Sequence, residues 1–463
     1  MNLAILGAGP GGYVAAIKAA QLGARVTVIE ENEVGGACLH WGCIPTKAIL
    51  SSCEILSRIR HSKAFGIDVK GEIVPNRSKI VERKNKIIGT QVKGIRNLFK
   101  SWGITLKEGR GNLSSPDKIA VTSRNGKTEK IATERIIIAT GSRPAGLADL
   151  PFDGKRIISS DDAVKLEDIP KSLLVVGAGA VGCEFAQIYN ELGSEVTILE
   201  ALPRAVPTED RDISKVLEKE IKKKKMKLYT GAKAKKIDLR QDGAHVTLPG
   251  GEEIVAQKIL VAVGRSLNSN GFGADEIGIE RGHRKEIVVN EKLETNVTGI
   301  YAIGDVIGGL LLAHVASREG IIAARNIMGA DEKIDYSAVP YAIFTSPEIA
   351  SVGLKEYEAE ERGIKISTGY FEFRTLAKSH CIGEIEGFVK MISDARSDRL
   401  LGVHIIGPHA SDLIHEAALA VRKGLTARDL SETIHTHPTL SEALKEAAED
   451  VRKEAVHIPR RVL

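Results

Sequence analysis

The chain has 463 residues, of which 43% are hydrophobic and 27% charged, as in a globular protein large enough for several domains. The net charge of +5 is small for this length, and the dense basic run at Lys222–Lys225 follows an amphipathic stretch. We therefore interpret that run as a solvated helix end and expect no nucleic-acid partner. No apolar run approaches the roughly 20 residues that span a bilayer, and a strand expected from Leu3 leaves no room for a leader peptide. These features predict no membrane partner and a cytoplasmic location.

The N-terminal segment carries a glycine-rich turn between two expected strands. Residues 3–6 and 26–29 are apolar, and a helical pattern lies between them. The second strand ends in Glu30. Three glycines in G-x-G-x-x-G spacing follow the first strand: Gly7, Gly9 and Gly12.

Residues 172–200 repeat this plan, with strands expected over 173–176 and 196–199 and with Glu200 as the terminal acid. The glycines of the second copy are Gly177, Gly179 and Gly182. Gly7 to Glu30 and Gly177 to Glu200 both span 23 positions. The matched spacing predicts two nucleotide-binding folds in one chain.

Each residue of this motif has a physical reason. The first glycine allows a sharp turn, the second allows the backbone to approach a pyrophosphate, and the third allows the helix to lie close to the strand. The helix N-terminus offers unpaired N–H groups to the phosphates, and the terminal acid accepts hydrogen bonds from ribose hydroxyls. The sequence therefore predicts two bound dinucleotides.

The terminal acid of the second copy also bears on cofactor choice. A 2′-phosphate would bring negative charge against Glu200, and two unit charges 4 Å apart repel by about 1 kcal/mol in water and about 4 kcal/mol at an effective dielectric near 20. This corresponds to roughly fivefold to a thousandfold discrimination against NADP, which Arg204, nearby in sequence, would soften. The second fold is expected to prefer NAD.

Cys38 and Cys43 lie in a segment marked by Gly42 and Pro45. Residues five apart in a regular helix have Cα atoms about 8.6 Å apart, whereas a disulfide needs about 4.4–6.8 Å. The thiols can bridge only if the turn is distorted, and such a bridge should be readily reduced. We interpret the pair as a redox couple, with a zinc half-site or two inert buried thiols as alternatives. The other cysteines are expected to be packed thiols: Cys53, Cys183 and Cys381.

The run from Cys38 to Lys47, C-x4-C-I-P-x-K, resembles the redox-active segment of the pyridine-nucleotide disulfide oxidoreductases. Residues 136–142, 299–305 and 312–314 resemble flavin-binding segments of the same family. The resemblance implies FAD and NAD as cofactors, no metal site, and an ion pair between Lys47 and Glu184 near the flavin. The cofactor-binding residues that it implies are Gly7, Gly9, Gly12, Glu30, Lys47, Gly111, Thr140, Gly141, Ser142, Gly177, Gly179, Gly182, Glu184, Glu200, Gly264, Asp305, Leu312, Ala313 and His314.

Residues 435–442, H-T-H-P-T-L-S-E, are most similar to the branch of this family that oxidises dihydrolipoyl groups. The resemblance makes His437 the acid/base and Glu442 the residue that orients it, and it leaves the contribution of His435 open. Four residues near the cysteines depart from those usual in the family and would tune potential or specificity: Ala37, His40, Trp41 and Thr46.

The resemblance also implies the reaction. A dihydrolipoyl group loses a proton to His437 and attacks Cys38, Cys43 is left as a thiolate against the flavin, and a hydride passes to NAD⁺. The implied partners are a second copy of the chain and the lipoyl domains of 2-oxo-acid dehydrogenase or glycine-cleavage complexes.

The implied fold is α/β, with two Rossmann-like dinucleotide-binding domains, a central domain and an α+β dimerisation domain. Strand-like runs at 388–392 and 400–406 fall in the last domain. The expected boundaries are 1–145 for FAD and the redox disulfide, 146–265 for NAD, 266–335 for the central domain that completes the FAD site, and 336–463 for the interface domain.

Two other functions compete with this hypothesis. One is another NAD(P)H-dependent reductase of small disulfides, similar to glutathione reductase, although such enzymes carry basic residues where this chain has Glu200. The other is a flavin-containing binding or signalling protein without turnover, for which the cysteine pair would be dispensable.

Overall fold

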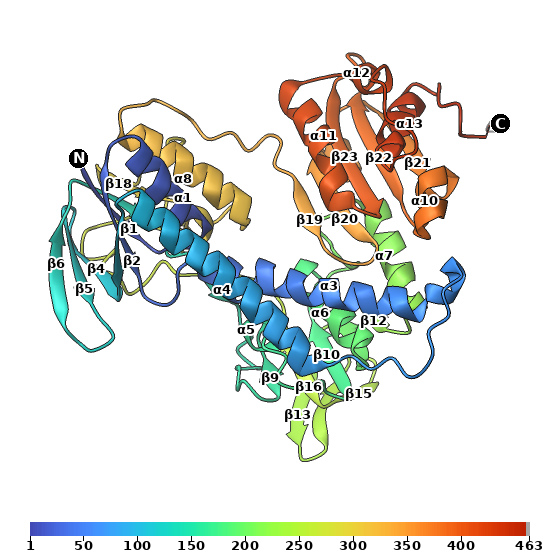
Figure 1. Ribbon diagram of the computed structural model, residues 1–463, viewed down its shortest axis with the longest axis horizontal. Helices are drawn as coiled ribbons and strands as arrows, with labels where there is room; N and C mark the ends of the chain where they lie inside the picture. Colours follow the sequence, from blue (N-terminus) through green and yellow to red (C-terminus); the bar gives the residue numbers. More distant parts are fainter. Residues whose placement is uncertain (460–463) are drawn as a thin grey trace. The chain divides into compact units, whose positions relative to one another are not determined.

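The computed structural model of the protein describes residues 1–459 (Figure 1). The chain divides into two compact units. The four-domain division expected from the sequence remains a prediction, and residues 460–463 of its last domain lie outside the described residues. Unit 1 comprises residues 1–146, 160–166 and 264–334. Unit 2 comprises residues 147–159, 167–263 and the described residues from 335 onward.

The core of unit 1 is a parallel sheet in the order β18-β7-β1-β2-β3. Its strands β1, β7 and β18 are apolar and almost wholly buried, as in a parallel sheet covered on both faces, whereas β3 at the edge is partly exposed. The strands are β1 (Asn2–Leu6), β2 (Arg25–Glu30), β3 (Thr105–Glu108), β7 (Arg135–Ile138) and β18 (Ile300–Ala302).

Helices α1 (Pro10–Gln21) and α8 (Ala313–Ile327) approach closely in unit 1 through small residues. A Cβ on Gly320 would lie 2.6 Å from the Gly11 carbonyl oxygen, so only glycine permits this crossing. The crossing brings the start of α8 to the glycine-rich turn. The other elements of unit 1 are α2 (Gly36–His40), α3 (Cys43–Arg60), η1 (Ser62–Phe65), α4 (Arg77–Ser101), α5 (Ser160–Ala163), η2 (Gly304–Ile307), the antiparallel sheet of β4 (Arg110–Ser115), β5 (Lys118–Thr122) and β6 (Thr128–Ala132), and the ribbon of β8 (Ser142–Pro144) and β17 (Arg265–Leu267).

Unit 2 repeats this architecture in its first part. A parallel sheet in the order β12-β11-β10-β16-β9 is accompanied by the antiparallel sheet β13-β14-β15. The elements are β9 (Ile157–Ile158), β10 (Ser172–Val176), α6 (Ala180–Glu191), β11 (Glu195–Leu199), α7 (Arg211–Lys223), β12 (Lys227–Tyr229), β13 (Lys236–Arg240), β14 (Gly243–Thr247), β15 (Glu253–Ala256) and β16 (Lys258–Val261).

The second part of unit 2 is an antiparallel sheet in the order β19-β20-β23-β22-β21 with its own apolar core. Helices α11 and α13 contact this sheet and supply buried alanines and leucines to that core. The elements are β19 (Tyr341–Ile343), β20 (Glu348–Gly353), α9 (Glu356–Glu361), β21 (Ile366–Glu372), η3 (Phe373–Thr375), α10 (Ala377–Ile382), β22 (Phe388–Asp394), β23 (Leu400–Gly407), α11 (Ala410–Lys423), α12 (Ala427–Ser431) and α13 (Glu442–Val451).

A buried lysine joins the two parts of unit 2. The side chain of Lys390 on β22 is only 5% exposed. Its Nζ lies 3.0 Å from Asp210, 2.8 Å from Asp212 and 2.5 Å from Glu356. Three carboxylates surround this one ammonium group, so the lysine can stay ionised away from water.

The strands predicted at 3–6, 26–29, 173–176, 196–199, 388–392 and 400–406 are confirmed. The run Lys222–Lys225 is confirmed as the end of α7. Among residues 1–459, no helix combines the length and apolar character needed to cross a membrane.

Candidate active site

The two glycine-rich turns have nearly identical geometry in their separate units. Gly7 and Gly177 adopt φ values of +102° and +103°, which favour glycine. A Cβ on Gly12 would overlap the Gly7 carbonyl oxygen, and one on Gly182 would overlap that of Gly177. The first glycine therefore makes the turn, and the third lets the helix approach it.

The middle glycines behave differently and show where a ligand fits. Gly9 and Gly179 precede α1 and α6 as their N-caps, and no side chain caps either helix. A Cβ on Gly9 would meet only the Gly36 Cα, at 3.9 Å, and one on Gly179 would meet nothing within 4 Å. Open space beside exposed helix N–H groups fits a pyrophosphate in both units.

The terminal acids are held alike. Glu30 accepts hydrogen bonds from Ala8 N at 2.7 Å and Asn32 N at 2.8 Å. Glu200 accepts them from Ala178 N at 2.6 Å and Leu202 N at 2.8 Å. Burial raises the pKa of Glu30, and the two backbone N–H groups oppose that rise. Each carboxylate oxygen keeps a lone pair for a ribose hydroxyl.

Unit 1 adds a polar cluster that the glycine motif does not contain. Ser142 donates its hydroxyl hydrogen to Asp305, and Arg265 donates from Nε to Ser142 Oγ at 2.6 Å and from Nη2 to the Ser142 carbonyl at 2.9 Å. Thr140 Oγ1 donates to the Asn268 carbonyl at 2.7 Å. The carboxylate of Asp305 is thus fixed in place, which fits an acceptor for a hydroxyl of the FAD chain.

The other predicted cofactor residues of unit 1 lie at the start of α8, in β4 and in turns. Leu312 is the N-cap of α8, and Ala313 and His314 open that helix. Gly141 and Gly264 have φ values of +70° and +126°. Gly111 lies on β4 against Leu6, Ile29 and Ile119. Of the three glycines Gly111, Gly141 and Gly264, only Gly111 has apolar side chains where a Cβ would lie, so a cofactor contact there would involve its backbone.

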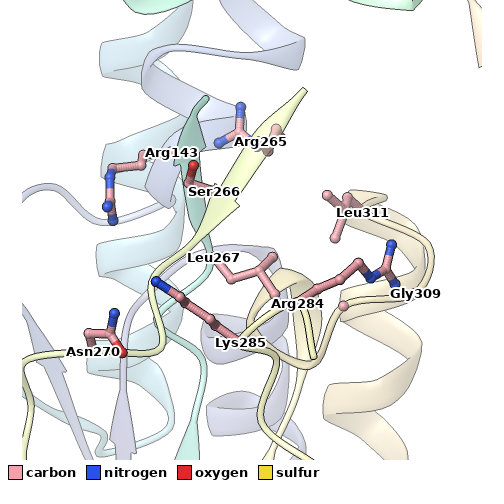
Figure 2. Close-up of a pocket in the computed structure, with 10 residues that line it drawn as sticks. Arg143, Arg265, Ser266, Leu267, Asn270, Arg284, Lys285, Gly309 and Leu311 are labelled. Carbon is pink, nitrogen blue, oxygen red and sulfur yellow. The ribbon is translucent and has the colours of Figure 1, made fainter. Parts of the chain in front are cut away.

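Unit 1 also contains a pocket of about 300 Å³ lined by ten residues, including Arg143, Arg265, Arg284, Lys285 and Leu311. Figure 2 shows that the charged ends of the four basic side chains point in different directions. Arg265 already contacts Ser142 and lies 3.6 Å from Asp305. The pocket therefore has positive charge without a common binding point.

The cysteine pair lies where a helix is broken. Cys38 is in α2, Cys43 opens α3, and Gly42 between these helices has the non-helical angles φ −126° and ψ −114°. The distortion predicted at Gly42 is therefore present, and Pro45 sits in the first turn of α3, where proline is tolerated.

Cys38 and Cys43 are both thiols and are hydrogen-bonded to each other. This hydrogen bond, followed by burial, raises the pKa of Cys38. Cys38 is half-buried and Cys43 is exposed, so the alternative of two buried thiols does not hold. Within residues 1–459, no three His, Cys, Asp or Glu side chains gather as a group that could hold a metal ion.

Three of the four residues that depart from the family pattern have side-chain contacts in the structure. Thr46 Oγ1 donates to the Gly42 carbonyl at 2.7 Å and so supports the break between the helices. His40 Nε2 lies 2.9 Å from the Val34 carbonyl oxygen, and its ring lies 5.4 Å from that of Trp41. Nothing in the structure accounts for Ala37.

The prediction that the other cysteines are packed thiols is correct for Cys53 and Cys183 and wrong for Cys381. Cys53 and Cys183 are buried, and burial raises the pKa of Cys183 to about 12. Cys381 is exposed at the end of α10, because that helix is short and only its Ser379 is buried.

The C-terminal site residues lie in unit 2, between α12 and α13. His437 Nδ1 is 2.9 Å from Glu442 Oε1, and Thr439 N donates to Glu442 Oε2 at 2.8 Å. The His437 side chain is 71% exposed. Glu442 thus fixes one ring nitrogen and leaves the other free to face a substrate.

Partial burial would raise the pKa of Glu442, but the hydrogen bonds from Thr439 and His437 outweigh it and lower that pKa. The sequence motif predicted that Glu442 pairs with His437. It did not predict the second hydrogen bond to Glu442, from the Thr439 N–H, because a backbone donor leaves no signal in side-chain patterns. Arg265 and Asn268 were missed for a similar reason, since their partners Ser142 and Thr140 are far away in sequence.

These features define an FAD- and NAD-dependent disulfide oxidoreductase. The family model described as pyridine nucleotide-disulphide oxidoreductase matches residues 1–320, and the model for the dimerisation domain of that family matches residues 339–448. The chain belongs to this family.

Among its relatives, the chain is 43% identical to dihydrolipoyl dehydrogenase of Thermus scotoductus, over 99% of this chain and 98% of that protein. It is 41% identical to dihydrolipoyl dehydrogenase of Chlamydia muridarum, over 98% and 97%. The crystal structure of LpdA from Mycobacterium tuberculosis superposes with a TM-score of 0.90 at 31% identity, over 97% of this chain and 99% of that one. The α/β fold class with a C-terminal dimerisation domain is confirmed.

Proposed function

We propose that the protein is a dihydrolipoyl dehydrogenase, which oxidises protein-bound dihydrolipoyl groups and delivers the electron pair to NAD⁺. The observation that carries the proposal is the hydrogen-bonded Cys38–Cys43 pair at the helix break beside the first nucleotide fold. Full-length similarity to dihydrolipoyl dehydrogenases of two bacteria supports the substrate class.

The chain's own residues account for the thiol chemistry. The thiolate is the nucleophile in disulfide exchange, so a base must first remove a proton from the substrate. His437 is exposed, and Glu442 holds its Nδ1 with a hydrogen on it, which leaves Nε2 to accept that proton.

In the oxidised pair, the substrate thiolate bonds to Cys38 Sγ, the Cys38–Cys43 bond breaks, and Cys43 leaves with its electrons. The second substrate sulfur then attacks the first and releases Cys38, so the substrate becomes a disulfide and the pair a dithiol. In the roles that the family resemblance implies, Cys38 keeps the remaining proton in its hydrogen bond with Cys43, and Cys43 carries the negative charge. FAD held by the turn at Gly7, Glu30 and the Ser142–Asp305 cluster would supply the redox chemistry that carries the electron pair from the reduced thiols to NAD⁺.

Cofactor assignment follows the two folds. FAD is held in unit 1 by the turn at Gly7, Glu30 and the Ser142–Asp305 cluster, and NAD in unit 2 by the turn at Gly177 and Glu200. Lys47 lies in α3 of unit 1, and Glu184 is buried on α6 of unit 2. The ion pair near the flavin that the family resemblance implies for these two residues stays a prediction.

The proposed partners are a second copy of the chain and a lipoyl domain. The segment that carries His437 also exposes Ile434, whose exposed fraction is 97%. An apolar side chain so exposed beside an acid/base favours a surface that another chain covers, and a homodimer in which that segment completes the partner's site would do so. The lipoyl domain would belong to a 2-oxo-acid dehydrogenase or glycine-cleavage complex, in the cytoplasm.

Steady-state kinetics test the proposal. Dihydrolipoamide oxidation should proceed with NAD⁺ and much more slowly with NADP⁺. Reduction of glutathione disulfide with a preference for NADPH would instead identify a reductase of small disulfides. If Cys43→Ser left all activity intact, the protein would not be a disulfide oxidoreductase of this mechanism.

A further inference from the structure

A second histidine pairs with a carboxylate in the segment that carries His437, residues 432–441, here called the His437 loop. His435 Nε2 lies 3.0 Å from Glu416 Oε1, and His435 Nδ1 lies 2.9 Å from the Thr433 carbonyl oxygen. The side chain of His435 is only 5% exposed, in contrast to the 71% of His437. The two histidines therefore have opposite environments although one residue separates them.

Both ring nitrogens of His435 face an acceptor that cannot donate. A carbonyl oxygen and a carboxylate accept hydrogen bonds only, and a neutral imidazole carries a single N–H. Both contacts are hydrogen bonds only when the ring carries two protons. The hydrogen bond with Glu416 raises the pKa of His435 against the opposing effect of burial, and the Thr433 carbonyl adds to the rise.

The charged ring connects the His437 loop to its surroundings. Glu416 belongs to α11, which is bound to the core of the antiparallel sheet. Thr433 Oγ1 also donates to the Asp429 carbonyl of α12, at 2.7 Å. His435 thus ties the first half of the loop to two helices.

The same charge acts on the catalytic dyad. The positive charge of His435 contributes to the lowered pKa of Glu442, after the effects of burial, Thr439 and His437. Lys445 on α13 is the cation that acts against the charge of His435. Glu416 therefore stabilises the positive charge of His435 and Lys445 destabilises it, and that charge in turn helps to keep Glu442 ionised.

We propose that His435 is a positioning residue for the acid/base step. As an imidazolium held by Glu416 and the Thr433 carbonyl, it fixes the His437 loop against α11 and supports the ionised Glu442 that orients His437. This inference rests on the proposed function, because it assigns His435 a role only through His437.

Two substitutions remove the anchor. His435→Gln keeps a polar side chain but can donate to only one of the two acceptors, and Glu416→Gln keeps the shape but removes the negative charge. Misplacing a reacting group by about 1 Å can cost roughly 100-fold in rate. At pH 8 we expect each variant to lower kcat for dihydrolipoamide oxidation by about 10- to 100-fold, with KM changed by less than about threefold.

A matched control is available in the same unit. His457 Nδ1 lies 2.7 Å from Glu446 Oε1, so it is also a histidine–glutamate pair, but it lies beyond the far end of α13. His457→Gln should leave kcat unchanged. Oxidation of NADH by an artificial acceptor, which requires FAD and NAD but not the dyad, should be unchanged in every variant and so excludes general loss of folding.

The pH dependence of Glu416→Gln gives a readout that a merely structural role would not. Glu416 raises the pKa of His435 and burial lowers it, so without the charge of Glu416 the ring should lose its second proton at or below the ordinary pKa of about 6.5. The ratio of variant to wild-type kcat should then be near one below that pH and should fall as the pH rises. A ratio independent of pH would overturn the role of the charge.

His437→Gln separates this inference from the function on which it rests. Loss of activity in His437→Gln with full activity in His435→Gln and Glu416→Gln would refute the positioning role and leave the proposed function standing. Full activity in His437→Gln would refute the proposed function itself. ¹⁵N spectra of labelled histidines at pH 8 should show His435 with two protonated nitrogens, and a single unprotonated nitrogen would contradict the proposal.

Discussion

Replacing the terminal acid of either nucleotide fold by glutamine should remove the same carboxylate acceptor, but it should weaken the binding of a different cofactor in each fold. Glu30 and Glu200 both accept two backbone N–H groups, at 2.6 to 2.8 Å. A glutamine offers one acceptor oxygen, so one of the two N–H groups loses its partner, at about 1–3 kcal/mol. A hydrogen bond from ribose to a charged carboxylate contributes about 1.5–3 kcal/mol, which corresponds to roughly 10- to 100-fold in affinity.

Glu200→Gln should raise the KM for NAD⁺ by about 10- to 100-fold and leave the flavin bound. It should also relax the discrimination against NADP⁺ by fivefold to nearly a thousandfold, since repulsion of about 1–4 kcal/mol at 4 Å is removed. Glu30→Gln should lose flavin during ultrafiltration, and the retained flavoprotein should keep its preference for NAD⁺.

The assay combines visible absorbance of the filtered protein with initial rates at varied NAD⁺ and NADP⁺. Loss of flavin from Glu200→Gln, or a changed nicotinamide preference in Glu30→Gln with the flavin retained, would refute the assignment of FAD to unit 1 and NAD to unit 2. Unchanged KM and unchanged flavin content in both variants would refute the role of the acids.

Three further outcomes are expected. Cys43→Ser should abolish dihydrolipoamide oxidation but not NADH oxidation by an artificial acceptor, and parallel loss of both rates would contradict the thiol chemistry. Because the pKa of Glu442 is lowered, its bond to His437 should stabilise the fold at neutral pH and be lost only as the pH falls below the ordinary carboxyl value of about 4.3. The difference in unfolding free energy between wild type and Glu442→Gln should therefore stay constant from pH 8 to pH 5, and a decline within that range would contradict this sign. Lys390→Met should lower the unfolding free energy by about 3–5 kcal/mol in denaturant titrations, because it leaves the buried carboxylate of Asp210 without its cation, and an unchanged midpoint would refute the role of this cluster.

Local patterns predicted much of the fold and the site. The glycine turns follow from three residues whose backbone and Cβ constraints are local, and both copies adopt the expected geometry, with φ near +102° at the first glycine. The helix break at Gly42 also followed from the distance that two cysteines five residues apart must overcome. His437 and Glu442 are five residues apart, so their hydrogen bond lies within reach of a sequence motif.

Contacts across long separations were not predictable. His435 gains its role from Glu416, 19 residues earlier on another helix, and Arg265 contacts Ser142 across 123 residues. Residues 264–334 group with the first nucleotide fold through the pairing of β18 with β7, which the family resemblance of residues 299–305 implied but no local physical pattern showed.

The central claim is that Cys43, and not Cys38, carries the negative charge of the reduced pair against the flavin. Anaerobic titration of the flavoprotein with dihydrolipoamide, followed by visible spectroscopy and then by addition of NAD⁺, tests it most directly. The wild type should develop long-wavelength thiolate-to-flavin absorbance on titration, and NAD⁺ should then abolish this band. Cys38→Ser should show the band without substrate, and Cys43→Ser should not show it at all. A band in Cys43→Ser, or none in the wild type, would contradict the account.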